Sequence, residues 1–235
     1  MLQTQDFFSA LEAARRPKHG GGNPFSRAWA AGELDRARLG DWAVQHFHYI
    51  DPIPQQFAQL FARLPDLDAR QHLLENLLGE EMPACPEKRH PDLLRKFARA
   101  CGVDDARVLG AEAAGEILPT TRAMRAWIWE LAGIRHIAEA CAGIMVALEG
   151  QLPTLYPGYL AAMRRMGFSD DELEFFIVHI EGDTEHAHVG LELTARYATT
   201  PALQQQAIAA VRASAAMRYS MLDGILSSVS GRDTA

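Results

Sequence analysis

Apolar residues recur every three or four positions along almost the whole chain, which is the periodicity of amphipathic helices. Many of these runs end at glycine or proline, as helices do. No segment alternates apolar and polar residues between turn signals, so no β-sheet is predicted. The pattern therefore predicts an all-α protein built as a helical bundle. The expected helices cover residues 6–16, 25–31, 39–64 with an interruption near 51–54, 66–81, 92–101, 104–115, 119–130, 134–149, 153–166, 169–198 and 201–228.

Three consecutive glycines, Gly20 to Gly22, stand between the first two expected helices. They do not match a phosphate-binding loop, because no strand precedes them and no Gly-Lys-Ser/Thr follows. We therefore expect one domain over residues 1–235. Within it, residues 1–24 would form an N-terminal helix and a flexible glycine-rich linker, and residues 25–229 the bundle core.

Composition narrows the class of protein. A chain of 235 residues with 48% hydrophobic content can bury one sizeable core. A net charge of −7 makes nucleic acid an unsuitable partner. The three cysteines have no paired spacing, the N-terminus has no signal-peptide pattern, and no apolar run is long enough to span a membrane. We expect a cytoplasmic protein with no membrane partner.

The most informative stretch lies in the helix expected over residues 169–198. At about 100° per residue, His179, Asp183 and His186 fall within roughly 60° of one another on its surface. Apolar residues such as Phe176 and Val189 flank this stripe, which favours a bundle interior over the alternative of a solvated helix face. Three residues of metal-ligand type therefore share one internal stripe.

Further candidate ligands occur at helix ends. Glu80 and Glu81 close the helix expected over 66–81, and Glu149 closes that over 134–149. Acids at the C-terminal end of a helix oppose its macrodipole, so a bound cation would relieve their placement. Other candidates are His46, His48, His72, His90, His136 and Glu139. Spacing alone does not show which of them meet.

Four motifs, in this order, resemble the haem-oxygenase-like diiron oxidases, a family related in fold to pyrroloquinoline quinone synthase and to thiaminase-type helical proteins. They are Asn-Leu-Leu-Gly-Glu-Glu at 76–81, His-Pro with two leucines at 90–94, Ala-Leu-Glu at 147–149, and His-x3-Asp-x2-His at 179–186. The resemblance covers roughly residues 23–198. It implies a haem-oxygenase-like helical bundle with a non-haem iron centre.

Carried over position by position, the resemblance implies two Fe(II) ions, with Mn(II) as an alternative metal. The implied ligands are Glu80, His90, Glu149, His179, Asp183 and His186. Gly79 stands where the family usually has an acid, and the loop at 82–89 lacks the usual glycines, so Glu81 remains an alternative to Glu80. Oxygen and nitrogen donors without thiolate suit these metals and disfavour a structural zinc site.

The remaining polar residues have simpler interpretations. His46, His48 and Tyr49 are expected to line a pocket or the core, because the family pattern has no iron ligand there. Glu139 is expected at the surface. Cys141 lies where thiaminase-type relatives carry a nucleophile, but the accompanying aromatic residues are missing, so we expect a buried small residue.

The resemblance implies an O2-activating oxidase or oxygenase acting on a small organic amine or carboxylic acid, by N-oxygenation, desaturation or oxidative decarboxylation. An external electron donor is a further expected partner. The chlamydial proteins that form p-aminobenzoate place a tyrosine before the ligand matching Glu149 and a lysine shortly after it. This chain has Leu148 and no lysine beyond Lys96, which disfavours that subtype.

Two alternatives stay open. One is a metal-free oxidase like pyrroloquinoline quinone synthase, or a thiaminase-type hydrolase; clustered acids without a cation would repel one another, which counts against it. The other is a non-catalytic helical binding protein. The apolar helix expected over 201–228 suits packing in a homodimer as well as in the core.

Overall fold

The computed structural model describes residues 1–229, and for residues 181–187 it describes the course of the helix but not the side chains. All regular structure within this part of the chain is helical, which confirms the predicted class. The α-helices are α1 (Thr4–Arg15), α2 (Pro24–Ala31), α3 (Arg36–Ile50), α4 (Ile53–Phe61), α5 (Leu67–Glu81), α6 (His90–Ala100), α7 (Asp105–Gly110), α8 (Pro119–Gly133), α9 (Ile137–Cys141), α10 (Leu152–Arg165), α11 (Glu174–Tyr197) and α12 (Pro201–Val229). None of the helices in the described range combines the length and hydrophobicity that a membrane crossing requires.

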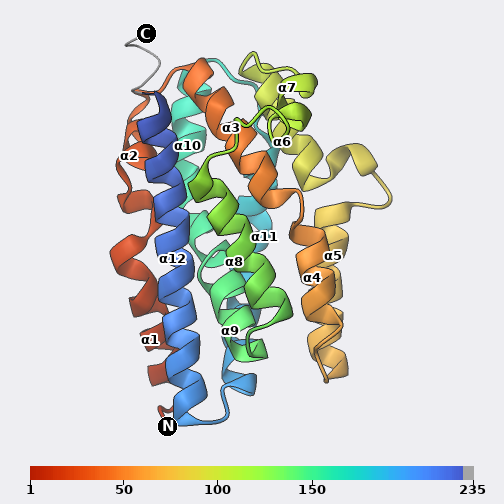
Figure 1. Ribbon diagram of the computed structural model, residues 1–235, viewed down its shortest axis with the longest axis vertical. Helices are drawn as coiled ribbons and strands as arrows, with labels where there is room; N and C mark the ends of the chain where they lie inside the picture. The colour runs from red at the N-terminus through yellow and green to blue at the C-terminus, as the bar shows by residue number, and fades with distance from the viewer. Residues whose placement is uncertain (230–235) are drawn as a thin grey trace.

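The helices form an elongated bundle in which α12 runs along most of the length (Figure 1). The first and last helices, α1 and α12, pack side by side along one flank, and the pair α4 and α5 lies at the opposite flank. Helix α11 packs against α9 and α10 and also contacts α5 and α6. These contacts bring α11, which carries the His-x3-Asp-x2-His motif, beside the ends of α5 and α6.

The glycine segment is built into the bundle instead of forming the flexible linker that its composition suggests. It consists of two 3-10 turns, Arg16–Lys18 and Gly20–Gly22. The Gly20 N–H donates a buried hydrogen bond of 2.8 Å to Oε1 of Gln151, and the Asn23 side chain accepts a 2.8 Å bond from the N–H of Phe25. Because Gln151 lies more than a hundred residues away in the sequence, local composition does not reveal this anchor.

The prediction of one continuous helix over 134–149 was wrong. A capping box formed by His136 and Glu139 starts α9 at Ile137, a π turn follows at Ala142–Val146, and Glu149 opens a 3-10 turn, Glu149–Gln151. The expectation of a surface Glu139 was also wrong, since it is only 9% exposed. Its carboxylate accepts a bond from the His136 N–H, and this local cap explains its burial.

The start of α11 is fixed by charge. The capping box predicted from Ser169 and Glu172 is present, with the Ser169 N–H donating to Glu172 at 2.8 Å, although the helix itself begins only at Glu174. The Glu174 carboxylate forms ion pairs with Lys88 at 2.6 Å and with Lys96 at 3.3 Å. These pairs tie the first turn of α11 to α6 and to the segment before it.

Helix α11 approaches the π turn closely at Gly190. A Cβ at this position would lie 2.6 Å from Cβ of Met145 and 3.4 Å from the Met145 carbonyl carbon. Neither atom is the end of a flexible side chain, so the contact leaves no room for a methyl group.

We predict that Gly190→Ala destabilises the protein by about 1–3 kcal/mol, because α11 must move away from the π turn. Gly79→Ala is the matched control, since a Cβ there meets nothing within 4 Å and a helical glycine is conformationally costly. That variant should gain about 0.5–1 kcal/mol. Urea unfolding of both variants measures the difference, and equal stabilities would contradict the close contact.

Candidate metal centre

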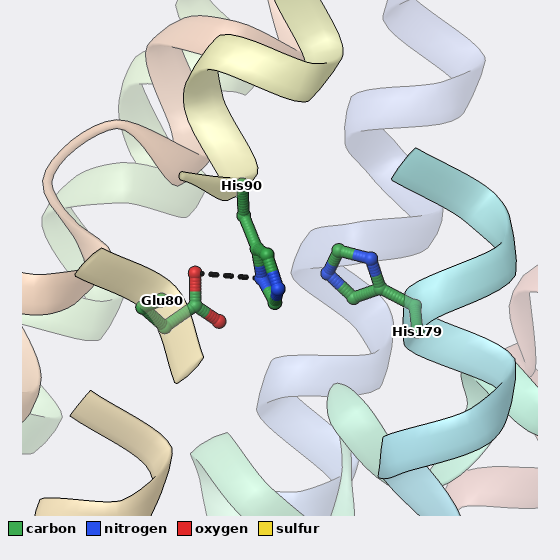
Figure 2. A group of neighbouring side chains, drawn as sticks. All are labelled: Glu80, His90 and His179. Carbon is green, nitrogen blue, oxygen red and sulfur yellow. Dashed lines mark ion pairs between the residues drawn. The ribbon is translucent and has the colours of Figure 1, made fainter. Parts of the chain in front are cut away.

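Three helices bring Glu80, His90 and His179 together (Figure 2). Glu80 lies on the last turn of α5, His90 is the first residue of α6, and His179 lies on α11. Each offers one ligand atom, and these three atoms lie within 4.8 Å of one another. These residues were predicted to be neighbours from the resemblance, and the structure places them so.

The two adjacent glutamates, Glu80 and Glu81, have different partners in the structure. Oε2 of Glu80 lies 3.0 Å from Nδ1 of His90, whereas Oε2 of Glu81 lies 2.7 Å from Nε of Arg89. The helix ends just after them, where Met82 adopts a left-handed backbone with φ of 40°. Glu80 therefore belongs to the cluster and Glu81 to an ion pair outside it.

A hydrogen bond to the main chain fixes the orientation of the His179 ring. Its Nδ1–H donates a 2.6 Å hydrogen bond to the carbonyl of Phe175, one turn earlier in α11. Because a carbonyl oxygen only accepts, this bond assigns the proton to Nδ1 and the lone pair to Nε2. The His90 ring stands between Glu80 and His179, with the two imidazole centroids 4.3 Å apart.

Of the other three predicted ligands, the structure describes the side chain of Glu149 but not those of Asp183 and His186. Glu149 lines the same cavity as the cluster, and the π turn before it ends the regular helix at this point. A π turn inside a helix is a frequent feature of functional sites. Asp183 and His186 belong to residues 181–187, whose side chains lie outside the described part of the structure. Metal binding by all six residues stays a prediction.

The donor set fits a metal such as iron. One carboxylate and two imidazoles converge, with no thiolate among them, which suits Fe(II) or Mn(II) better than a structural zinc ion. The side chains of Glu80 and His90 are 17% and 18% exposed, so a metal ion can reach them. Two basic atoms only 3.0 Å apart require a proton or a cation between them, and a metal ion satisfies this requirement.

The cluster borders a cavity of about 410 Å³ with mostly apolar walls. The walls include Ile50, Phe57, Ile144, Leu148, Leu152 and Phe175. As expected, His46 and Tyr49 line this cavity, and His48 is buried in the core, where its Nε2 lies 2.8 Å from the carbonyl oxygen of Val108. Burial, with the nearby Arg218 and His179, lowers the pKa of His46 well below its usual value, so this imidazole is neutral near pH 7.

Sequence reasoning missed the buried arginine of the cavity, Arg218 on α12. It also did not identify Lys88 and Glu174, which form an ion pair in the cavity wall. The side chain of Arg218 is only 3% exposed. A signal was present, since Arg218 falls on the same helical stripe as Val211, Ala215, Leu222 and Ile225, all of them buried. An arginine on an apolar stripe marks a charge directed into the protein.

Three comparisons relate the chain to known proteins. The sequence profile of a family described as "Iron-containing redox enzyme" matches residues 40–219. A 4-aminobenzoate synthase of Nitrosomonas europaea is 29% identical over 235 residues, covering 95% of this chain and 92% of that protein. A pyrroloquinoline-quinone synthase of Granulibacter bethesdensis is 28% identical over 230 residues, covering 96% of this chain and 87% of that protein.

Solved structures share the fold. A TenA homologue from Pseudomonas syringae has a TM-score of 0.78 at 16% identity, covering 95% of this chain and 92% of its own. A domain with a heme oxygenase-like fold from Shewanella denitrificans has a TM-score of 0.79 at 15% identity, covering 100% of this chain and 96% of its own. The haem-oxygenase-like bundle predicted from the motifs is thereby confirmed.

The cysteines provide a test of the thiaminase-type alternative. Cys141 is fully buried and Cys101 is 7% exposed, and burial raises the pKa of each thiol to about 12. We predict that Ellman's reagent labels only the partly exposed Cys85 rapidly in the native protein, and all three cysteines after denaturation. Cys85→Ser is the control and should abolish rapid labelling. Rapid labelling that persists in this variant would instead indicate a reactive thiol at one of the buried positions.

Proposed function

Because the chain belongs to the family of iron-containing redox enzymes with the haem-oxygenase-like fold, we propose that it is an O2-activating oxidase or oxygenase with two iron ions. Its substrate is a small organic amine or carboxylic acid. The proposed ligands are Glu80, His90, Glu149, His179, Asp183 and His186. Mn(II) shares the same donor preference and is the alternative metal.

The observation that carries this proposal is the convergence of Glu80, His90 and His179 beside a largely apolar cavity. Glu149 lines the same cavity, which adds a carboxylate beyond Glu80 and the lysine-paired Glu174. A cation among these groups would offset the repulsion between their negative charges, and a pair of divalent ions supplies that charge. Bundle proteins with carboxylate-bridged metal pairs use this combination of acids and imidazoles.

Two ferrous ions at this site would supply electrons for the reduction of O2. The protein supplies the rest of the environment. The Phe175 carbonyl holds His179 in the tautomer that presents Nε2, and the apolar walls limit the access of water. The Lys88–Glu174 ion pair lies at the rim of the cavity, where the Lys88 side chain is 50% exposed.

The reaction classes that suit this site are N-oxygenation, desaturation and oxidative decarboxylation of a small molecule. A cavity of about 410 Å³ is within the size range of small-molecule sites. The relative from Nitrosomonas europaea is a 4-aminobenzoate synthase. The tyrosine and lysine expected from the resemblance to the chlamydial proteins that form p-aminobenzoate are missing here, since the chain has Leu148 and no lysine after Lys96, and we therefore do not propose that reaction. Return of both irons to the ferrous state would require an external electron donor.

We predict that anaerobic loading with Fe(II), followed by gel filtration and metal analysis, gives about two irons per chain, and that O2 then produces a transient visible absorbance. Glu80→Gln should remove about one iron or more, because it deletes a charged ligand. His179→Ala should do the same. Glu81→Gln is the matched control and should retain the iron, because Glu81 pairs with Arg89 instead.

Two results would count against this proposal in different ways. Loss of iron in Glu81→Gln but not in Glu80→Gln would reassign the ligand at the end of α5. Absence of specific iron uptake by the unmodified chain would overturn the metal centre and favour the metal-free alternative.

A further inference from the structure

Arg218 places a positive charge in the wall of the cavity that holds the metal cluster. The residue comes from α12, whereas the cluster comes from α5, α6 and α11. It is 3% exposed, so bulk water does not solvate its guanidinium group. A buried charge is strongly unfavourable unless another charge or a set of hydrogen bonds compensates it.

Three tyrosines surround Arg218. Its guanidinium carbon lies 5.6 Å from the ring centroid of Tyr49. Its side chain forms hydrogen bonds with the phenols of Tyr49 and Tyr156, and Tyr159 is close enough to act on its charge. Among the residues that the structure describes, Nε of Arg218 has no hydrogen-bond partner and the side chain forms no ion pair with a carboxylate. The tyrosines therefore compensate this charge only in part.

The cavity wall has a second cation, Lys88, which differs from Arg218 in its exposure to solvent and in having an acidic partner. It is half exposed and its ammonium group lies 2.6 Å from the Glu174 carboxylate. Lys88 is thus satisfied by the protein itself. Arg218 is the cavity cation, within the described part of the chain, whose charge still lacks an anionic partner.

We propose that Arg218 binds the carboxylate of the substrate. A guanidinium group presents a planar fork of N–H donors that matches a carboxylate with two parallel hydrogen bonds. A bound organic acid would complete the compensation of the buried charge, and its apolar body would fill the cavity between Arg218 and the metal cluster. The same charge would repel a simple amine, so the inference narrows the substrate class to organic acids.

The identification of this ligand as the substrate rests on the proposed function of the cluster. Tyr156 lies beside Arg218, and its ring centroid is 6.0 Å from that of His179. A single side chain therefore neighbours both the arginine and one of the proposed metal ligands.

Calorimetric binding to the metal-free protein tests the proposal without relying on activity. The probes are benzoate, 4-phenylbutyrate and octanoate, each compared with its uncharged amide of nearly equal size. We expect at least one acid to bind about tenfold or more tightly than its amide, because only the acid forms a charge-assisted pair. Arg218→Gln should abolish this preference, and Arg218→Lys should keep part of it.

Arg63→Gln is the matched control. Arg63 donates a 2.6 Å hydrogen bond to the carbonyl of Ala132 and does not line the cavity, so its loss should leave the preference for acids unchanged. Circular dichroism establishes whether Arg218→Gln is folded. If it is not, the wild-type comparison of acid with amide and the Arg218→Lys variant decide the question.

The outcomes separate the two proposals. Equal or absent binding of acid and amide in all three pairs, or a preference that survives in folded Arg218→Gln, would overturn the role of Arg218 whatever the iron content. A preference for acids in a chain that takes up no iron would overturn the metal centre and leave the carboxylate site intact.

Discussion

The structure depends on balancing the charges of acidic and basic side chains that line a largely apolar cavity. Glu80 and His90 present basic atoms 3.0 Å apart, and Glu149 adds another carboxylate to the wall of the same cavity. Such groups raise the free energy of the folded state unless protons or cations lie among them. The bundle supports the arrangement from outside, because the Glu174 ion pairs and the Phe175 carbonyl fix the helix turn that carries His179.

Much of the fold and part of the site could be predicted from the sequence, because both depend on local signals. Helical periodicity gave most of the helix boundaries, and the ordered motifs identified Glu80, His90 and His179, which the structure brings together. The glycine segment, the π turn and the burial of Glu139 could not be predicted. Each depends on a tertiary contact or on a one-residue change of helical register, which leaves no periodic trace in the sequence.

The relatives show how widely one scaffold is used. The chain shares its fold with structures only 15–16% identical, which include a TenA homologue, and its family includes iron enzymes. A bundle of this kind fixes where helix ends converge but not which reaction takes place there. The chemistry is set by a few side chains at the site and not by the overall fold.

Arg218 and the metal cluster come from separate helices, α12 and the set α5, α6 and α11. Substitutions along α12 can therefore change the wall of the cavity without altering the proposed metal ligands. Within such a family, substrate specificity can therefore change by substitutions at one end of the cavity while the residues at the other end stay the same. Helix α12 is accordingly the first place to compare when two members of the family act on different molecules.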